Sequence, residues 1–299
     1  MWKTSHVMLV CGVVAAVALT WGSGKKTEKQ TDKSWTVDGG ALSIVTPCAK
    51  TVSIEPSPDL TGKVEVSATG RRSEIDRLDV AGGATAAIGA RDGKCKEGGG
   101  PHLSFTLFRL GVDTGPSLAI TVKVPAGTAI DIKEGKSTDY DIGAVGGVLT
   151  LDLSGNGNVS AAEVKDPVLH LSGSGDAQLD KVSGKLDGRL TGSGDLSIGR
   201  ADVSVADVAS SGSGDISVDD GDFTAVTARL TGSGDLSLGE GKIGSLTVGA
   251  SGSGGAQVDA VVGDADLSAS GSGDIEVHEV TGQMKQAHHG SASIKIGDH

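Results

Sequence analysis

The stretch Leu230-Thr231-Gly232-Ser233-Gly234-Asp235-Leu236-Ser237-Leu238 decides the fold, because the chain repeats it with small changes. Its Gly-Ser-Gly core recurs at Gly173–Gly175, Gly192–Gly194, Gly212–Gly214, Gly232–Gly234, Gly252–Gly254 and Gly271–Gly273. A relaxed copy over Gly155–Asn158 precedes these cores, and a degenerate copy over Gly290–Ser293 follows them. The residue that closes each core lies 18 to 20 residues after the previous one. A fixed period of this length is typical of a solenoid.

The residues after each core alternate in the way of a β-strand. With the closing residue as position 0, positions +1 and +3 are aliphatic in every copy, and position +2 is polar. Leu236, Ser237 and Leu238 are one example. This alternation predicts a strand with one buried face. A helix is excluded because two glycines per copy would each cost about 1 kcal/mol relative to alanine.

One strand per copy cannot bury its apolar face alone, so successive copies are expected to stack. We predict an all-β fold, a parallel β-helix (solenoid) with about 19–20 residues per turn. A β-rich amino-terminal cap is expected before it. Neighbouring turns would lie about 4.8 Å apart. The glycines at positions −3 and −1 would point inward at a sharp corner, where backbones approach closely and no Cβ fits.

The outward positions −4, −2 and 0 of this corner hold Ser or Thr, Ser, and Asp, and stacking would line them up on one edge. We call this edge the outer ladder. Its candidate binding residues are Asp176, Asp195, Asp215, Asp235, Asp274, Ser174, Ser193, Ser213, Ser233, Thr191 and Thr231. Gly255 interrupts the row of carboxylates.

Two interpretations of the outer ladder remain open. Stacked carboxylates about 5 Å apart repel by roughly 1 kcal/mol per pair in water, which suggests a compensating purpose such as a linear glycan site or weak Ca²⁺ binding. Asp and Ser after Gly are also ordinary turn residues, and outward acidic residues keep sheets from aggregating. We favour the turn interpretation, and we expect no metal site and no cofactor beyond weak Ca²⁺.

The first 33 residues differ from the rest of the chain. Residues 1–24 contain the apolar run Val7–Thr20 behind Lys3, which is typical of a signal peptide or an uncleaved amino-terminal anchor. Residues 25–34 resemble a solvated linker. We assign residues 35–117 to the β-rich cap and residues 118–299 to the parallel β-helix. In the repeat frame, Ile130 and Ile132 would occupy positions +1 and +3 of the first turn.

Cys48 and Cys95 are the only cysteines outside the leader. A pair of cysteines in an exported chain predicts a disulfide. No spacing of Cys and His suggests a metal centre.

Charge and composition limit the partners. The chain carries −12 overall and +3 over its first 33 residues, so the remainder carries −15. This charge argues against nucleic acid and anionic membrane surfaces, and leaves a membrane contact only through an uncleaved amino-terminal segment. Only seven residues are aromatic, whereas a deep ligand pocket usually contains several. We expect an exported protein of the periplasm, the cell envelope or the extracellular space.

The Gly-Ser-Gly-Asp repeats, behind a Val124-Pro125-Ala126-Gly127 strand end and an export leader, resemble bacterial proteins with the GIN-type domain. That family is described as heads of auto-transporter adhesins. The resemblance covers roughly residues 118–299 and implies a β-solenoid with an adhesin-like role. It brings no catalytic motif with it.

Three function classes follow. The first is a non-enzymatic binding or scaffolding module that recognises a glycan or another cell-surface component. The second is a polysaccharide-acting β-helix enzyme, for which no set of nucleophile, base and orienting group is visible. The third is a structural protein that assembles end to end, because solenoid ends leave backbone groups unpaired. We expect the first class and no enzyme.

Overall fold

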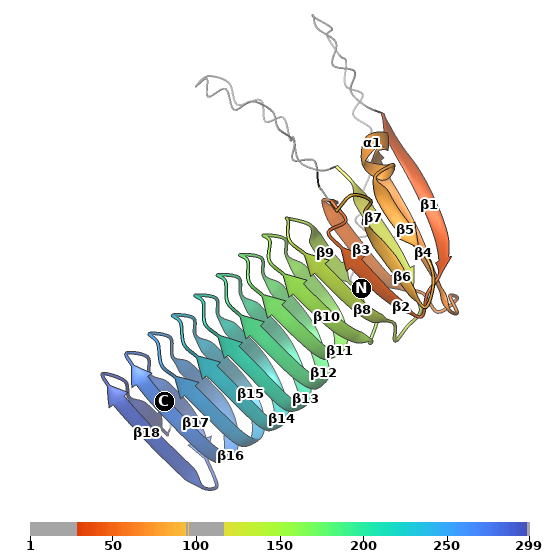
Figure 1. Ribbon diagram of the computed structural model, residues 1–299. Helices are drawn as coiled ribbons and strands as arrows, with labels where there is room; N and C mark the ends of the chain where they lie inside the picture. Colours follow the sequence, from red (N-terminus) through yellow and green to blue (C-terminus); the bar gives the residue numbers. More distant parts are fainter. Residues whose placement is uncertain (1–28, 94, 96–116, 298–299) are drawn as a thin grey trace, which may run out of the picture.

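The structure is a computed structural model that describes residues 29–93, 95 and 117–297. It is an elongated stack of β-coils, covered at its amino-terminal end and open at its carboxy-terminal end (Figure 1). The longest strands are β11 (Val159–Leu171), β12 (Ala177–Leu190), β13 (Leu196–Ser210), β14 (Ile216–Leu230), β15 (Leu236–Ala250) and β16 (Ala256–Gly271). Each of them pairs in parallel with the next. The predicted parallel β-solenoid is confirmed.

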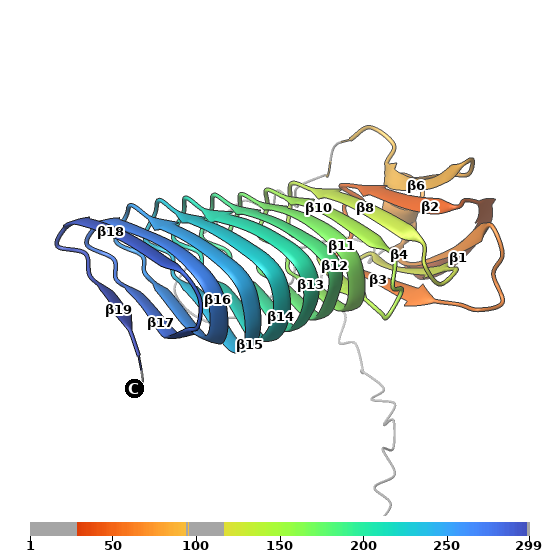
Figure 2. The same cartoon turned by 90° about the horizontal axis from the view of Figure 1, so that it is seen from below.

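Each long strand bends, so that a single strand contributes to both walls of its coil (Figure 2). The register follows the repeat, because Leu196 pairs with Ile216 and Ile216 pairs with Leu236. Leu236 and Leu238 are buried, and Ser237 between them is exposed. Aliphatic columns at equivalent positions of all coils therefore form one continuous core along the stack.

The carboxy-terminal coil leaves its outer edge unpaired among the described residues. It consists of β17 (Ile275–Val280), β18 (Met284–Gly290) and β19 (Ile294–Ile296). β18 pairs with β16, and β19 pairs with β17. Every residue of β18 is exposed. Gln286 and His288 pair with the buried Leu267 and Ala269, so polar residues occupy core columns on this last coil.

The first coils are assembled out of chain order. They use β2 (Ala41–Val45), β3 (Thr51–Pro56), β6 (Thr85–Ala90), β7 (Ala119–Val124), β8 (Ala129–Glu134), β9 (Asp139–Ile142) and β10 (Val148–Leu153). Along one wall the order is β10-β8-β2-β6, and along the other it is β11-β9-β3-β7, all in parallel. The coil of β2 and β3 thus lies between residues that follow it by more than 30 positions. Parallel pairing begins inside the region 35–117 that the sequence assigns to the cap.

Antiparallel elements cover the amino-terminal end. β1 (Gln30–Asp38) pairs with β4 (Lys63–Arg71), which pairs with β7, while β5 (Leu78–Ala81) pairs with β6. A single helical turn, α1 (Arg72–Ile75), follows β4. Residues 30–34 are strand rather than the expected linker, because their polar side chains find partners across the pair. Thr69 donates to Asp32 at 2.7 Å, and the hydroxyls of Ser34 and Ser67 lie 3.2 Å apart.

The frame predicted for the first turn is wrong. Ile130 and Ile132 pair with Leu149 and Leu151, which precede a corner rather than follow one. The corner of that coil is the segment 134–139, where Lys136 and Thr138 stand in the usual glycine positions. They fit because the neighbouring corner, residues 46–50, is irregular and has positive φ at Thr46 and Cys48. The Thr138 hydroxyl donates to the Ala49 carbonyl at 2.9 Å.

The predicted disulfide is confirmed. Cys48 lies in the corner between β2 and β3, and Cys95 lies beyond the end of β6. Their sulfur atoms are 2.03 Å apart, and the two residues are 47 positions apart in sequence. The bond joins two adjacent coils at the covered end.

Within the described part of the chain, no helix has the length and apolar character needed to span a bilayer. The expected leader over residues 1–24 lies outside the described residues.

Candidate functional site

The Gly-Ser-Gly corner requires glycine because the preceding coil fills the space of a side chain. A Cβ placed on Gly232 would lie 1.9 Å from the carbonyl oxygen of Gly212, and one on Gly234 would lie 2.0 Å from that of Gly214. The same approach recurs through the regular coils. Backbone hydrogen bonds join the corners, such as Ser233 N–H to the Gly212 carbonyl at 3.0 Å. The corners therefore stack as a tight, nearly identical column.

The aspartates of the outer ladder form a chain of hydrogen bonds from coil to coil. The N–H of Asp195 donates to Asp176 Oδ1 at 2.9 Å, and that of Asp215 donates to Asp195 Oδ1 at 2.9 Å. Asp235 continues the series by donating to Asp215 Oδ1 at 2.8 Å. Asn158 begins it with an amide oxygen in place of a carboxylate, 2.9 Å from the N–H of Asp176. Each of these side chains thus satisfies a backbone donor that the corner would otherwise leave to water.

Gly255 interrupts this chain of bonds. Its N–H donates to Asp235 Oδ1 at 2.7 Å, but it has no side chain to accept from Asp274. The series resumes at Asp274 Oδ1, which accepts the hydroxyl and the N–H of Ser293, both at 2.8 Å. The Ser293 hydroxyl, followed by its N–H, lowers the pKa of Asp274. The structure thus stacks Asp176, Asp195, Asp215 and Asp235 directly, and places Asp274 beyond a gap of one coil.

The candidate hydroxyls lie on the same edge. Ser174, Ser193, Ser213, Ser233, Thr191 and Thr231 are all exposed. Among the described residues, no side-chain hydrogen bond engages these hydroxyls or the second carboxylate oxygens of Asp176, Asp195, Asp215 and Asp235. The outer ladder therefore presents one solvated carboxylate oxygen and solvated hydroxyls at each regular coil.

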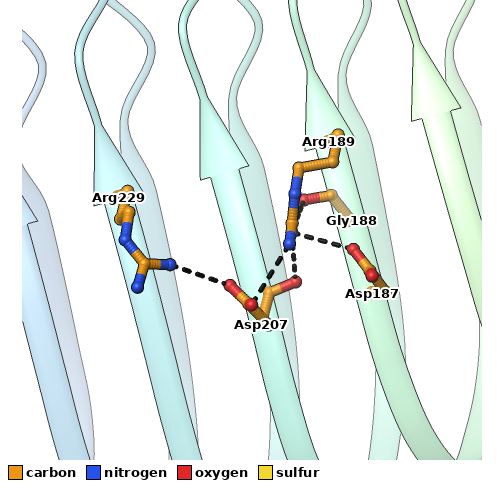
Figure 3. Close-up of polar contacts among 5 residues, drawn as sticks. All are labelled: Asp187, Gly188, Arg189, Asp207 and Arg229. Atoms are coloured by element: carbon orange, nitrogen blue, oxygen red, sulfur yellow. Dashed lines mark hydrogen bonds and ion pairs between the residues drawn. The ribbon is translucent and has the colours of Figure 1, made fainter.

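A charge network on the β12–β14 wall was not predicted from the sequence. Arg189 Nη1 lies 2.8 Å from Asp187 Oδ1, and Arg189 Nη2 lies 3.1 Å from Asp207 Oδ2 (Figure 3). Arg229 reaches the other oxygen of Asp207 at 3.2 Å from the opposite side. The small Ala209 pairs with both arginines and separates them by one coil. The repeat shows that the arginines share a column, but only the register shows that Asp207 lies between them.

This network is arranged for cross-strand pairing rather than for catalysis. Each arginine is paired with a carboxylate, and His170, which pairs with Arg189 on the preceding coil, adds no second charge partner. Ion pairs of this exposure contribute about 0–1 kcal/mol each. Their main effect is to fix the register between neighbouring coils.

A buried polar pair lies where the regular coils begin. Glu134 is 2 % exposed. Its Oε1 accepts the Lys136 N–H at 2.6 Å, and its Oε2 accepts the Tyr140 hydroxyl at 3.1 Å. Burial, with the charge and hydrogen bond of Glu134, raises the pKa of Tyr140. The pair satisfies the irregular corner of that coil.

Within the described part of the chain, no group of three or more His, Cys, Asp or Glu side chains is placed to hold a metal ion. The outer ladder contributes one carboxylate per coil, whereas Ca²⁺ takes six to eight oxygen ligands.

The chain resembles known proteins in sequence and in fold. The model of the family described as "Putative auto-transporter adhesin, head GIN domain" matches residues 51–223 and 205–298. No curated protein matches the chain.

Three solved structures share its fold at low sequence identity. A putative adhesin of Parabacteroides distasonis is 16% identical with a TM-score of 0.56, and the match covers 90% of this chain and 98% of that one. A putative lipid binding protein of the same species is 15% identical with a TM-score of 0.52, covering 91% and 97%. A putative adhesin of Parabacteroides merdae is 14% identical with a TM-score of 0.53, covering 90% and 97%. These likenesses extend the solenoid and its covered end to other bacterial proteins.

Proposed function

The chain belongs to the family described as putative auto-transporter adhesin, head GIN domain, and from this premise we propose that it is a non-enzymatic binding module of the bacterial cell envelope. Its ligand in this proposal is a glycan or another cell-surface component. The protein is exported to the periplasm, the envelope surface or the extracellular space, and the apolar run over Val7–Thr20 directs this export.

One observation carries the proposal. The outer ladder repeats an exposed carboxylate oxygen and exposed hydroxyls on successive coils of a stack whose backbone is held by continuous parallel pairing. A polymer with its own repeat can contact several such coils at once. Each contact can be weak, because linked contacts raise the overall affinity without any strong single site.

The direct test is a binding screen of the purified full chain against a glycan array and whole bacterial and host cells. The proposal expects saturable binding to at least one surface glycan or cell type. Absence of binding to every glycan and every cell type, at protein concentrations up to the millimolar range, contradicts it.

The open carboxy-terminal edge favours end-to-end assembly as a second candidate function. β18 and β19 present unpaired strand edges among the described residues, and Met284 and Ile296 are 44% and 37% exposed. Unpaired edges are templates for pairing with another chain. Light scattering at increasing concentration tests this candidate, which expects dimers or longer species. A strict monomer at high concentration rules it out.

A further inference from the structure

A hollow of about 380 Å³ lies on the bend of three successive coils, roughly halfway round the coil from the Gly-Ser-Gly corner. It is lined by Asp202, Val203 and Ser204 of β13, by Asp222, Phe223 and Thr224 of β14, and by Lys242 of β15. Its volume falls within the roughly 300–1,000 Å³ typical of small-molecule sites. The outer ladder is a separate edge of the same coils.

The repeat breaks locally to form this hollow. Phe223 occupies a bend column otherwise filled by Val203 and Ile243. Its ring fits because Gly221 lacks a side chain, since a Cβ there would lie 2.5 Å from Phe223 Cε2. The column of Ser204 and Thr224 continues in Gly244, which adds no side chain beside Thr224. A larger ring below and a missing side chain above are thus combined at one place.

The lining combines an apolar floor with a polar rim. Val203 and Phe223 form the floor. The N–H of Lys242 donates to Asp222 Oδ1 at 3.1 Å, which fixes that carboxylate. Among the described residues, no hydrogen bond or ion pair engages the Asp202 carboxylate, the Thr224 hydroxyl or the Lys242 ammonium. The rim therefore offers acceptors, one strong donor and a hydroxyl that the fold itself does not use.

We propose that this hollow binds one pyranose ring of a neutral glycan, an inference that rests on the proposed binding function and names its ligand class. A pyranose has an apolar C–H face, which matches the Val203 and Phe223 floor, and a rim of hydroxyls, which match carboxylates and an ammonium. Two carboxylates against one ammonium leave the hollow with a net negative charge, which disfavours sugars that carry an acidic group. The outer ladder then acts as the extended contact and the hollow as the point of recognition.

The test is an NMR titration of the full chain with maltotriose, cellotriose and triacetylchitotriose. Binding in the hollow is expected to shift the amide signals of Asp222, Phe223 and Lys242. Thr224→Tyr fills the hollow from an exposed strand position, and Lys242→Ala removes the strong donor. The matched control is Thr247→Tyr, which adds the same ring at an exposed position of β15 outside the hollow.

The proposal expects Thr224→Tyr and Lys242→Ala each to weaken binding of at least one trisaccharide by about tenfold or more, because a hydrogen bond to a charged group is lost or blocked. Thr247→Tyr is expected to leave the affinity unchanged. If glycans bind but neither hollow variant alters their affinity, the inference is overturned and the proposed function stands. If none of the trisaccharides shifts these amides while the chain still binds cells, the hollow is again excluded. If the chain binds neither glycans nor cells, the inference and the proposed function fail together.

Discussion

At the scale of single residues, the corner glycines and aspartates have different tasks. The glycines allow the coils to approach, since any side chain at Gly214 would meet the backbone of the preceding coil at 2.0 Å. The aspartates accept backbone donors on the outside of that same corner. The repeat is therefore first a device for stacking, and its solvated oxygens are what remains for binding.

Gly214→Ala is expected to destabilise the fold by about 3 kcal/mol or more, because the new Cβ forces two coils apart. Gly249→Ala is the control, since nothing lies within 4 Å of a Cβ at that position. Alanine there is expected to be neutral or stabilising by up to about 1 kcal/mol, because glycine weakens a strand. Urea unfolding measures both variants. Equal free energies of unfolding for the two variants would contradict the account of the corner.

Asp215→Asn and Asp215→Ala separate hydrogen bonding from charge. The Asn variant is expected to keep its bond to the Asp235 N–H, as Asn158 does with Asp176, and to relieve repulsion between stacked carboxylates. Its stability should equal or slightly exceed that of the parent. The Ala variant loses the bond and is expected to cost about 1 kcal/mol. Thermal unfolding of the three proteins in low salt checks the order, and an Asn variant as unstable as the Ala variant would refute it.

At the scale of elements, α1 is fastened to the start of β7 by one carboxylate. Glu74 Oε2 accepts the Ser117 hydroxyl at 2.6 Å, and Glu74 Oε1 accepts the Ser117 N–H at 3.1 Å. Arg71 pairs with the same carboxylate. Burial raises the pKa of Glu74, but the hydrogen bonds from Arg71 and Ser117 outweigh it and lower the pKa from 4.5 to about 2.

This shift predicts a pH dependence of the covered end. Because the folded-state pKa lies below the unfolded value, the contribution of Glu74 is complete above about pH 4.5 and is lost as the pH falls towards about 2. Glu74→Gln is expected to flatten the fall in stability over that window. Denaturant unfolding from pH 5 to pH 2 measures it, with Glu65→Gln on the exposed side of β4 as the control. Identical pH profiles for the parent and Glu74→Gln would be inconsistent with this role.

The disulfide is expected to stabilise the same end. Linking residues 47 positions apart restricts the unfolded chain by roughly 3–4 kcal/mol. Replacing both Cys48 and Cys95 by Ser should lower the free energy of unfolding by about that amount. Guanidinium unfolding of the variant and of the reduced parent gives the comparison. A reduced parent as stable as the oxidised one would show that the bond does not contribute.

At the scale of the whole molecule, the part of the fold that repeats could be predicted and the part that does not could not. Alternation around Leu236 and Leu238 and the paired glycines define strand, burial and corner within one repeat, so nearest neighbours determine them. The coil of β2 and β3 pairs with β8 and β9, which lie far along the chain, and leaves no period to detect. The first corner was missed for a related reason, since Lys136 and Thr138 replace its glycines.

The candidate site follows the same division. The positions of the outer-ladder residues follow from the repeat, but the bonds between Asp195 Oδ1 and the next coil depend on the register. The network around Asp207 and the hollow beside Phe223 each join residues of separate coils. Such sites become visible only when the stack is assembled.

The most direct test of the proposed function compares two charge-matched triple variants in the cell- and glycan-binding assay. Asp195→Asn, Asp215→Asn and Asp235→Asn remove three carboxylates from the outer ladder while keeping their hydrogen bonds. Asp180→Asn, Asp219→Asn and Asp259→Asn remove three exposed carboxylates from another face of the coils. We predict that the first triple variant loses binding at least about tenfold while the second retains it. Equal binding by both variants and the parent would show that the outer ladder serves the fold alone.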